Sequence, residues 1–480
     1  MRIATLHNTI FHMLDILNEV NDFLWTYIVI TLLVICAVYF TVKTRGVQFR
    51  SLKETWKLLS EKSSADNKVT ESKKKKKSVN SFQAFAISLS SRVGTGNLAG
   101  VASAIFVGGP GAVFWMWVMA LLGAATAFVE STLAQLYKKK GEDSFYGGPA
   151  YYMQTGLKKK WMGILFAVLI TITFGMANQT VQSNTLCDAL SDSIGIDKIG
   201  VGITLTIMTL IIIFGGVQRI AKFSSIVVPF MAIGYILMAL FITAINITHI
   251  PNMLRIIVEN AFGLEQFGGG MVGIAVMEGV KRGLFSNEAG EGSAPNAAAT
   301  ADISHPVKQG LLQAVGVFAD TLVICTCTAF MILLSGLYGG ELDGILLTKA
   351  AIVSEIGTSG GWFLTAAIFL FAYSTIIANY FYGETNIRLI TRKKWAVNAF
   401  RIITGLTVML GALVTLQTAW SMVDICMGLM TVCNLIAILL LSDKAFKLLK
   451  NYMEQRRAGK NPEFHRNMMP EIEKDIECWE

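Results

Sequence analysis

Long apolar blocks constrain this sequence more than any other feature. Residues 23–42 read FLWTYIVITLLVICAVYFTV, and residues 163–177 read GILFAVLITITFGMA. A helix needs about 20 apolar residues to cross the hydrocarbon core of a bilayer. Only 15% of the 480 residues are charged, whereas a soluble domain averages about a quarter. The chain is therefore predicted to be an all-α integral membrane protein.

Hydropathy predicts about eleven transmembrane helices. They fall near residues 23–42, 83–106, 111–136, 161–186, 199–216, 222–247, 268–302, 309–335, 361–388, 397–417 and 419–441. The leader before the first span contains acidic residues and shows neither a basic n-region nor a small-residue cleavage site. We therefore expect a retained first helix rather than a signal peptide.

The basic residues predict the orientation, because cytoplasmic loops carry an excess of Lys and Arg. With strict alternation, one side receives Lys43, Arg45, Arg50, Lys53, Lys57, the lysines at 73–77, 138–140 and 158–160, Arg219, Lys222, Lys308, the bases at 392–394 and those of the C-terminal tail. The other side receives mainly acidic residues. The N-terminus is predicted to lie outside and the C-terminus in the cytoplasm. The net charge of +8 is thereby explained without a nucleic-acid partner.

Two helices are predicted to be interrupted. In the second span, Gly94 and Gly96 flank Thr95 and precede Asn97. Glycine costs about 1 kcal/mol inside a helix, so this run favours unwinding, with Asn97 capping a second half-helix. The alternative is close helix packing, because Gly96 and Gly100 form a GxxxG pair.

The seventh span repeats this design in GLFSNEAGEGSAPNAAATADISHP, residues 283–306. Ser293 is the predicted N-cap, and Pro295 fits the first turn that follows. Irregular backbone at membrane depth is tolerated only inside protein or along a cavity. Exposed N–H groups at a half-helix N-terminus can bind a carboxylate, and free carbonyls can bind a cation.

The two breaks lie five spans apart, so two five-helix units would have opposite topology. We predict a first inverted repeat at 82–247 and a second at 267–442, within a single transporter domain of residues 1–480. The helix at 23–42 is then an extra N-terminal helix, and 443–480 form a cytoplasmic tail. Paired breaks in inverted halves are typical of secondary transporters with a midplane site.

Four blocks carry a specific resemblance: SRVGTGNLAGVASAIFVGGPGAVFWMWV, GGPAYYMQTGL, RGLFSNEAGEGSAPNAAA and YSTIIANYFYGE. Together they resemble the alanine or glycine:cation symporter family of the APC superfamily, over nearly the whole chain. The resemblance implies a LeuT-like five-plus-five fold and import of a small neutral amino acid with Na⁺. It also implies a bacterial inner membrane, and we expect a monomer with an oligomer left open.

The resemblance assigns the site residues. Gly94, Thr95 and Gly96 would receive the substrate carboxylate, and Gln182 matches a substrate-contacting glutamine. The substrate set is completed by Asn97, Asn287 and Asn379. The hydroxyls of Ser374 and Thr375 would bind Na⁺ together with carbonyls near Ser90 and Val93. From the residues alone, Gln182 is equally a helix–helix hydrogen-bonding residue, and Ser-Thr pairs usually bond their own helix.

The sequence departs from the family at one position. The family often has Gly-Trp where this chain has Ala378-Asn379. That tryptophan can wall the pocket, so Asn379 would make it larger and more polar. Alanine or glycine is the first expectation for the substrate, and glutamine or asparagine is the alternative.

Charged residues in the spans leave several roles open. Arg92 is expected to reach an aqueous vestibule or a carboxylate. Glu291 is expected to hold loop N–H groups or to pair with Lys281, Arg282 or Arg92, while Glu288 is equally a candidate for that structural role and for cation coordination, gating or proton coupling. Glu130, Asp320 and Asp424 are further intramembrane carboxylates without a predicted partner.

Other classes fit less well. A channel would need a continuous polar lining. An H⁺-coupled amino-acid porter would need a titratable group at the breaks, and Glu288 leaves this alternative open. The five histidines are scattered and no HExxH motif or phosphate loop is present, so an enzyme is not expected. The seven cysteines are also scattered and predict neither a disulfide framework nor a metal site.

Overall fold

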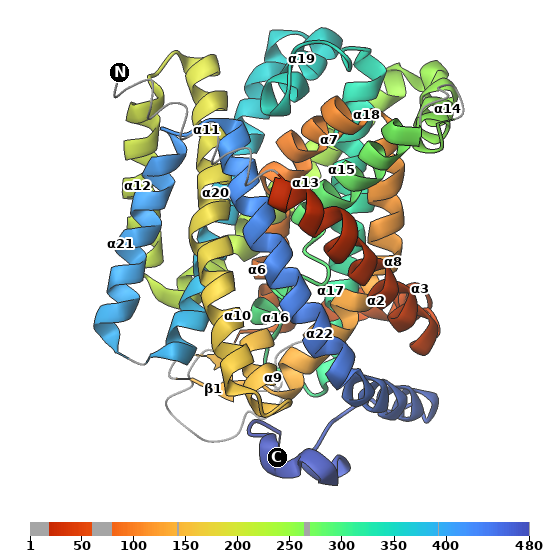
Figure 1. The fold of residues 1–480 in the computed structure, drawn as a ribbon, viewed down its shortest axis with the longest axis vertical. Coiled ribbons are helices and arrows are strands. Elements are labelled where there is room, and N and C mark those ends of the chain that lie inside the picture. Colours follow the sequence, from red (N-terminus) through yellow and green to blue (C-terminus); the bar gives the residue numbers. More distant parts are fainter. Residues whose placement is uncertain (1–18, 60–78, 142–143, 264–268, 392, 480) are drawn as a thin grey trace.

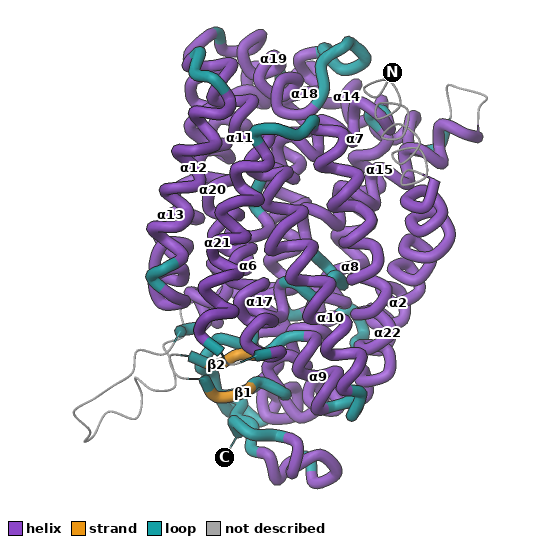
Figure 2. Tube along the Cα trace, turned by 60° about the vertical axis from the view of Figure 1, so that its left-hand side comes forward, coloured by secondary structure: helices purple, strands orange, loops and turns teal. Residues whose placement is uncertain are grey.

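The computed structural model describes residues 19–59, 79–141, 144–263, 269–391 and 393–479. Within these ranges the chain is a bundle of helices with one short β-hairpin (Figure 1). Figure 2 shows that most helices run roughly parallel to the long axis, and that the hairpin lies near the C-terminus at one end. We call this the C-terminal end of the molecule. The predicted lysine run at 73–77 lies outside the described residues.

The first half of the chain holds η1 (Leu24–Val29), α2 (Ile30–Lys43), α3 (Val47–Arg50), α4 (Leu52–Leu59), α6 (Ser81–Arg92), η2 (Gly96–Gly100), α7 (Val101–Gly108), α8 (Gly111–Leu136), β1 (Lys139–Lys140), β2 (Phe145–Tyr146), α9 (Pro149–Thr155), α10 (Lys160–Ile172), η3 (Thr173–Ala177), α11 (Asn178–Ile194), α12 (Lys198–Ile213) and α13 (Gly216–Ile245). The two strands pair antiparallel.

The second half holds η4 (Ile247–His249), α14 (Ile250–Ala261), α15 (Gly269–Asn287), α16 (Ala294–Ala298), α17 (Pro306–Val317), η5 (Phe318–Cys325), α18 (Thr326–Ser335), α19 (Gly344–Ile356), α20 (Thr358–Ile390), α21 (Lys394–Gly411), α22 (Leu416–Arg457), η6 (Arg466–Met468) and η7 (Pro470–Asp475). The segments η1, η2, η3 and η5 are π-helical, a form that often marks functional sites.

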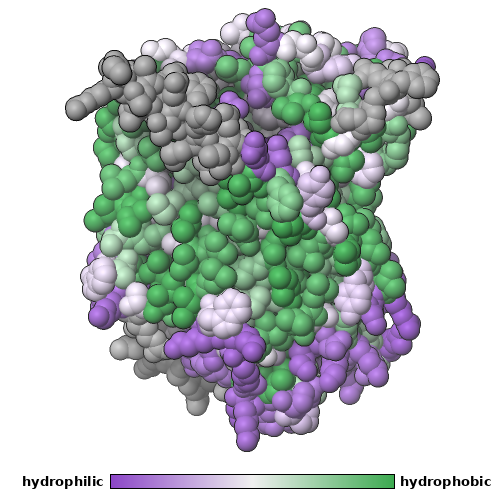
Figure 3. Space-filling view, viewed as in Figure 1, coloured by the Kyte–Doolittle hydropathy of each residue, from purple (hydrophilic) through white to green (hydrophobic). Residues whose placement is uncertain are grey.

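Seven helices in the described ranges are long and apolar enough to cross a bilayer. They are Glu19–Lys43, Gly111–Leu136, Lys160–Ile194, Gly216–Ile245, Pro306–Ser335, Thr358–Ile390 and Leu416–Arg457. Figure 3 shows the matching surface, an apolar belt between two more polar ends. The four other predicted spans are helical but shorter, interrupted or more polar (α6–α7, α12, α15–α16 and α21). Eleven crossings therefore remain a prediction, and membrane embedding is established.

Two helices occupy segments that we expected to be loops, α14 and α19. Both lie at the end opposite the C-terminus (Figure 1). The start of α19 is fixed by Asp343, whose side chain accepts a hydrogen bond from the N–H of Gly344 at 2.5 Å and another from Ser103 at 2.7 Å. Such a cap satisfies one of the free N–H groups of a helix start.

The long helices form two packed groups. In one, α8 packs along α15 and α17, with α2 on its outer side; in the other, α20 packs along α10, α11 and α13. Small residues permit the closest approaches. A Cβ on Gly310 of α17 would lie 2.2 Å from Thr132 Oγ1 of α8. The α6–η2 break lies where α20 of the second group approaches the first.

Candidate substrate and cation site

The first predicted break is present. Helix α6 ends at Arg92, Val93 has φ −80° and ψ 82°, and the helix resumes at Gly96. Gly94 lies where side chains converge: a Cβ there would be 2.4 Å from Thr375 Oγ1 and 2.9 Å from Gln182 Oε1. Glycine is thus required at this position because a side chain would clash with Thr375 and Gln182 and because the backbone is unwound.

The four residues predicted for the cation lie together. Thr375 Oγ1 donates to the carbonyl of Ser90 at 2.8 Å and lies 3.4 Å from that of Val93, while Ser90 Oγ donates to the carbonyl of Ser374 at 3.0 Å. The hydroxyl of Ser374 instead bonds its own helix at Phe371 O. The break therefore presents uncharged oxygens next to α20. In the described residues, His, Cys, Asp and Glu form no group that could hold a metal ion.

The backbone N–H groups predicted to bind a carboxylate face amide oxygens. The N–H of Gly94 donates to Asn97 Oδ1 at 2.9 Å, and that of Thr95 donates to Gln182 Oε1 at 3.1 Å. The prediction that Asn97 caps the second half-helix is wrong in its geometry. Thr95 occupies the N-cap position of η2 without a side-chain bond, and Asn97 reaches back into the break, because the unwound turn brings the N–H of Gly94 within its reach.

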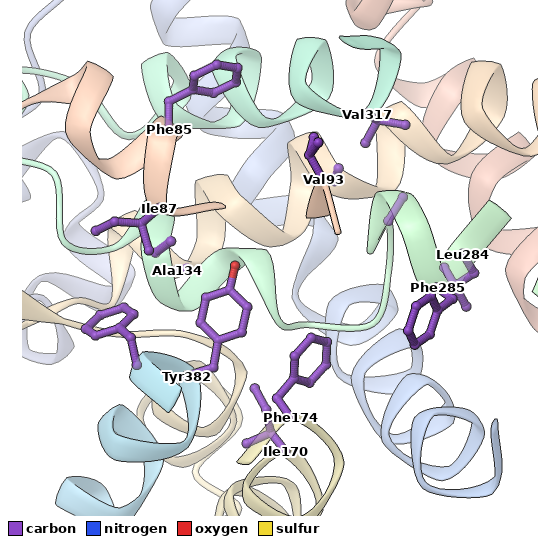
Figure 4. Packing of buried hydrophobic residues seen from close by; sticks show 14 of the residues in the cluster. Phe85, Ile87, Val93, Ala134, Ile170, Phe174, Leu284, Phe285, Val317 and Tyr382 are labelled. Carbon is purple, nitrogen blue, oxygen red and sulfur yellow. The ribbon is translucent and has the colours of Figure 1, made fainter. Parts of the chain in front are cut away.

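Aromatic rings close the other side of the break, a feature that the sequence reasoning did not find. A Cβ on Gly96 would lie 2.8 Å from Phe285 Cδ1, and the rings of Phe285 and Trp420 pack edge to face at 4.7 Å. On the side toward α10, the rings of Phe174 and Tyr382 pack edge to face with their centroids 5.4 Å apart (Figure 4). The hydroxyl of Thr95 is buried without a partner in the described part of the chain.

The second predicted break is also present, between Asn287 and Ala294. Glu288 has φ +57°, and Gly290 and Gly292 have φ +95° and +87°, values that glycine tolerates best. Ser293 occupies the predicted N-cap position and Pro295 the first turn, but Ser293 makes no capping bond.

Asn287 and Asn379 make their hydrogen bonds with residues other than Gly94, Thr95 and Gly96. Asn287 donates to Thr321 at 3.1 Å and accepts from the N–H of Ala289 at 3.0 Å, which stabilises the second break. Asn379 Oδ1 lies 2.7 Å from Ser91 Oγ at the end of α6. Neither residue hydrogen-bonds the 94–96 backbone in the described structure.

Two carboxylates connect the two breaks, and the sequence did not predict this. Asp320 accepts from Asn97 and from Ser286, each at 2.7 Å. Glu288 accepts from Ser91 and from Ser293 (2.6 Å for Ser293). Each carboxylate thus holds one residue of the first broken helix and one of the second. Only the position of these acids inside spans signalled their importance.

Two expectations about charged residues are wrong. Arg92 is 1% exposed and donates to the carbonyl of Gln313 at 3.1 Å, so in the described structure it neither opens to solvent nor forms an ion pair, although several carboxylates lie in its electrostatic neighbourhood. Its Nε and Nη2 have no partner in the described residues. Glu291 neither holds loop N–H groups nor forms an ion pair. The physical reason is that Arg282 is already paired, with Asp424 at 2.8 Å, and Lys281 lies 3.6 Å from Asp22.

The fold and the two joined breaks define a polytopic helical membrane transporter. A solved structure of the same fold is the crystal structure of a mutant of the Eremococcus coleocola manganese transporter, with a TM-score of 0.51, 11% identity and coverage of 83% of this chain and 84% of that one. The likeness concerns the fold alone.

The chain belongs to the sodium:alanine symporter family, whose sequence model matches residues 11–466. It is 48% identical over 465 residues to the "Probable sodium/glutamine symporter GlnT" of Bacillus subtilis (strain 168), covering 97% of this chain and 95% of that protein. It is 43% identical over 469 residues to the "Putative sodium/proton-dependent alanine carrier protein YrbD" of the same organism, covering 94% and 95%. The family predicted from the four sequence blocks is confirmed, and a transporter rather than an enzyme is established.

Proposed function

We propose that this chain is a Na⁺-coupled symporter that imports a small neutral amino acid by alternating access. One observation carries the proposal: the Thr375 hydroxyl meets the carbonyls of Ser90 and Val93 directly beside the unwound backbone of the first break. The proposed cation ligands Ser90 and Val93 therefore lie immediately before the backbone that would bind the carboxylate, which begins at Gly94. Coupling follows, because binding of either solute fixes the same segment.

Na⁺ is the cation that this site fits. The hydroxyl of Thr375 donates one proton but also offers lone pairs, so it can turn from the carbonyls and join them around an ion. Ser374 would complete the set by rotating its hydroxyl away from Phe371 O. These ligands are neutral oxygens, which suit a hard monovalent cation and leave no fixed charge to trap it.

The amino acid would bind at the N–H groups of Gly94, Thr95 and Gly96. Asn97 and Gln182 now place amide oxygens on two of them. A substrate carboxylate offers the same acceptor chemistry with a full charge, which makes the bonds stronger. Displaced from Thr95, the Gln182 amide would remain close enough to contact the substrate. This supports the predicted role of Gln182.

The proposal includes the LeuT-like five-plus-five architecture. Repeats at 82–247 and 267–442 would each begin with a broken helix, and the observed breaks at 93–95 and 288–293 fit this. The helix at 23–42 would be extra, and 443–480 would form the cytoplasmic tail of a monomer. With eleven crossings, the N-terminus lies outside and the C-terminus inside a bacterial inner membrane, as the loop charges require.

Two substrates compete. Alanine, or glycine, follows from the family and from the name of the alanine carrier relative. Glutamine, with asparagine, follows from Asn379 and from the name of the glutamine symporter relative. The amide Nδ2 of Asn379 is buried without a partner in the described residues, and it could bond the side-chain carbonyl of glutamine.

The test is uptake of radiolabelled alanine and glutamine into proteoliposomes with a Na⁺ gradient, against a matched K⁺ gradient. We expect Na⁺-dependent uptake of at least one of them. Uptake that is equal in K⁺, or absent for both, would contradict the proposal. Strong inhibition of alanine uptake by excess glutamine would indicate the larger pocket that Asn379 predicts.

Thr375→Val removes the hydroxyl and retains the shape, and Thr375→Ser retains the hydroxyl. Hydrogen bonds to a charged group contribute about 1.5–3 kcal/mol, so Thr375→Val is expected to weaken the apparent Na⁺ affinity about tenfold or more. Thr375→Ser should keep an apparent Na⁺ affinity close to that of the parent. The readout is the Na⁺ concentration for half-maximal uptake, and equal values for both variants would exclude Thr375 as a ligand.

A further inference from the structure

Among the buried carboxylates in the described parts of the chain, Glu291 is the exception. Its exposed fraction is 0%, and neither carboxylate oxygen has a hydrogen-bond partner in the described structure. The others all have partners. Glu130 accepts from the N–H of Gly290 and from Asn434, and Asp424 accepts two bonds from Arg282. Packing alone therefore does not account for a carboxyl group at Glu291.

The charges around Glu291 do not neutralise it. Its charged neighbours are Glu288 on the same loop, Glu130 from α8 and Arg92 from α6. The other titratable groups near this cluster are Asp320 of η5, Tyr152 of α9, Tyr382 of α20 and Cys433 of α22. With Asp320, four carboxyl groups thus share one guanidinium.

An ionised carboxylate buried without hydrogen bonds costs many kcal/mol, so such a group takes up a proton instead. If all four carboxyl groups were ionised, the cluster would hold three uncompensated negative charges. Hydrogen bonds decide which group keeps its charge. Asp320 is supported by the bonds from Asn97 and Ser286. Glu288 accepts from Ser91 and Ser293, and Glu130 accepts from Gly290 and Asn434. Glu291 has no such support and is the group that binds the proton.

The local backbone gives this carboxyl group a way to move. Gly290 and Gly292 flank Glu291, and both have positive φ. Glu288 connects Ser91 at the end of α6 with Ser293 at the start of α16. Of the half-helices at the two breaks, α6 and α16 are the two on the side of the C-terminal end of the molecule. Their separation would break the Glu288 contacts and admit water to Glu291.

We propose that Glu291 is a proton-binding site that is loaded in this compact arrangement and unloaded when α6 and α16 separate. In the step, the carboxyl O–H bond breaks, the proton passes to water, and a hydrated carboxylate remains. Return to the compact arrangement restores the O–H bond with a proton from the opposite side. The proton exchange rests on the proposed function, whereas the binding of a proton by Glu291 does not.

Infrared spectroscopy tests the binding directly on the purified full chain in detergent. A protonated carboxyl group has a C=O stretch that shifts in D₂O. We expect this band in the parent, its loss in Glu291→Gln, and its retention in Glu341→Gln, a change in an exposed loop. A band that survives Glu291→Gln would place the proton elsewhere and overturn the proposal. Should Glu291→Gln not yield folded protein, absence of the band in the parent would overturn it equally.

Proteoliposomes with an internal pH dye, a Na⁺ gradient and a clamped membrane potential test the exchange. We expect the parent and Glu341→Gln to acidify the lumen as radiolabelled amino acid enters. For Glu291→Gln, the number of protons that enter per amino acid should be at the background level. Amino-acid uptake by the parent without acidification would overturn proton exchange and leave the symporter intact. No uptake of any amino acid by the parent would instead refute the proposed function.

Discussion

At the scale of single residues, Gly94 is where a methyl group should matter most. Its Cβ would meet Thr375 Oγ1 at 2.4 Å and Gln182 Oε1 at 2.9 Å, and overpacking costs about 1–3 kcal/mol. Gly94→Ala should therefore displace both proposed ligand groups and lower uptake about tenfold or more. Gly273→Ala is the matched control, because its Cβ meets nothing within 4 Å. Equal uptake by the two variants would exclude the proposed site.

Residue types at this site could be predicted from the sequence, and their partners could not. Ser90, Val93 and Thr375 are in contact in the structure, because their positions on a break and on a spanning helix determine which carbonyls are free, while their role as cation ligands stays a prediction. The bonds of Asp320 to Asn97, and of Glu130 to Asn434, join residues more than 200 positions apart. Such pairs depend on how the helices pack, which local sequence patterns do not encode.

At the scale of elements, the start of α17 gives a pH prediction. His305 Nδ1 accepts from the N–H of Val307, and Nε2 lies 3.2 Å from Asn451 Oδ1. The bond from Val307 needs an unprotonated Nδ1, whereas Nε2–H can donate to Asn451 in either charge state, and burial lowers the pKa of His305 from 6.5 to about 3. Above pH 6.5 the ring is neutral whether folded or unfolded. Below it the unfolded form gains a proton that the folded form excludes, so stability should fall between pH 6.5 and 3.

His305→Asn separates this effect from other acid-sensitive groups. Asparagine also caps helices and does not titrate in this range, so its variant should lose less thermal stability than the parent between pH 7 and pH 5. The measurement is the unfolding temperature in detergent at each pH. Identical acid shifts in the two proteins would mean that His305 does not control this element.

The breaks were the elements that the sequence predicted best, because a Gly-rich polar run inside an apolar block is disfavoured both within a helix and within lipid. The structure places them at 93–95 and 288–293. The helices α14 and α19 were missed because they are short and lie between spans, where hydropathy indicates only a loop. The π-helical segments depend on tertiary packing and leave no sequence signal that we could recognise.

At the scale of the whole molecule, the apolar blocks predicted the membrane class. The C-terminal segment, in contrast, is docked against the helix bundle. Helix α22 continues to Arg457, and the chain then returns to the bundle. Phe464 N–H donates to the carbonyl of Ser304 at 2.9 Å, and Trp479 is 5% exposed. The sequence analysis predicted a cytoplasmic tail and not its docking, because the apolar residues that dock it are few and widely spaced.

Trp479 is the residue on which this docking should depend. Its Nε1–H donates to the carbonyl of Gln135 at 3.1 Å, and its ring lies 4.5 Å from the ammonium of Lys138. Lys138 is 2% exposed, also donates to the carbonyl of Ala301 at 2.9 Å, and its pKa is lowered to about 8 by burial. The tail thus covers a cation beside the loop that follows α16.

Removal of this ring should release the tail. Trp479→Ala would lose burial and cation–π contact together, about 3 kcal/mol or more, and should speed trypsin cleavage at Lys460 and Lys474. Trp479→Phe retains the apolar ring and loses only the bond to Gln135, so its cleavage should stay closer to that of the parent. Because the docked segment contacts Ser304 and Lys138 at the proposed cytoplasmic end, release should also change the uptake rate. Unchanged cleavage of Trp479→Ala would show that Phe464 and the ion pairs of Lys158 with Asp475 and Lys139 with Glu477 are sufficient to retain the tail.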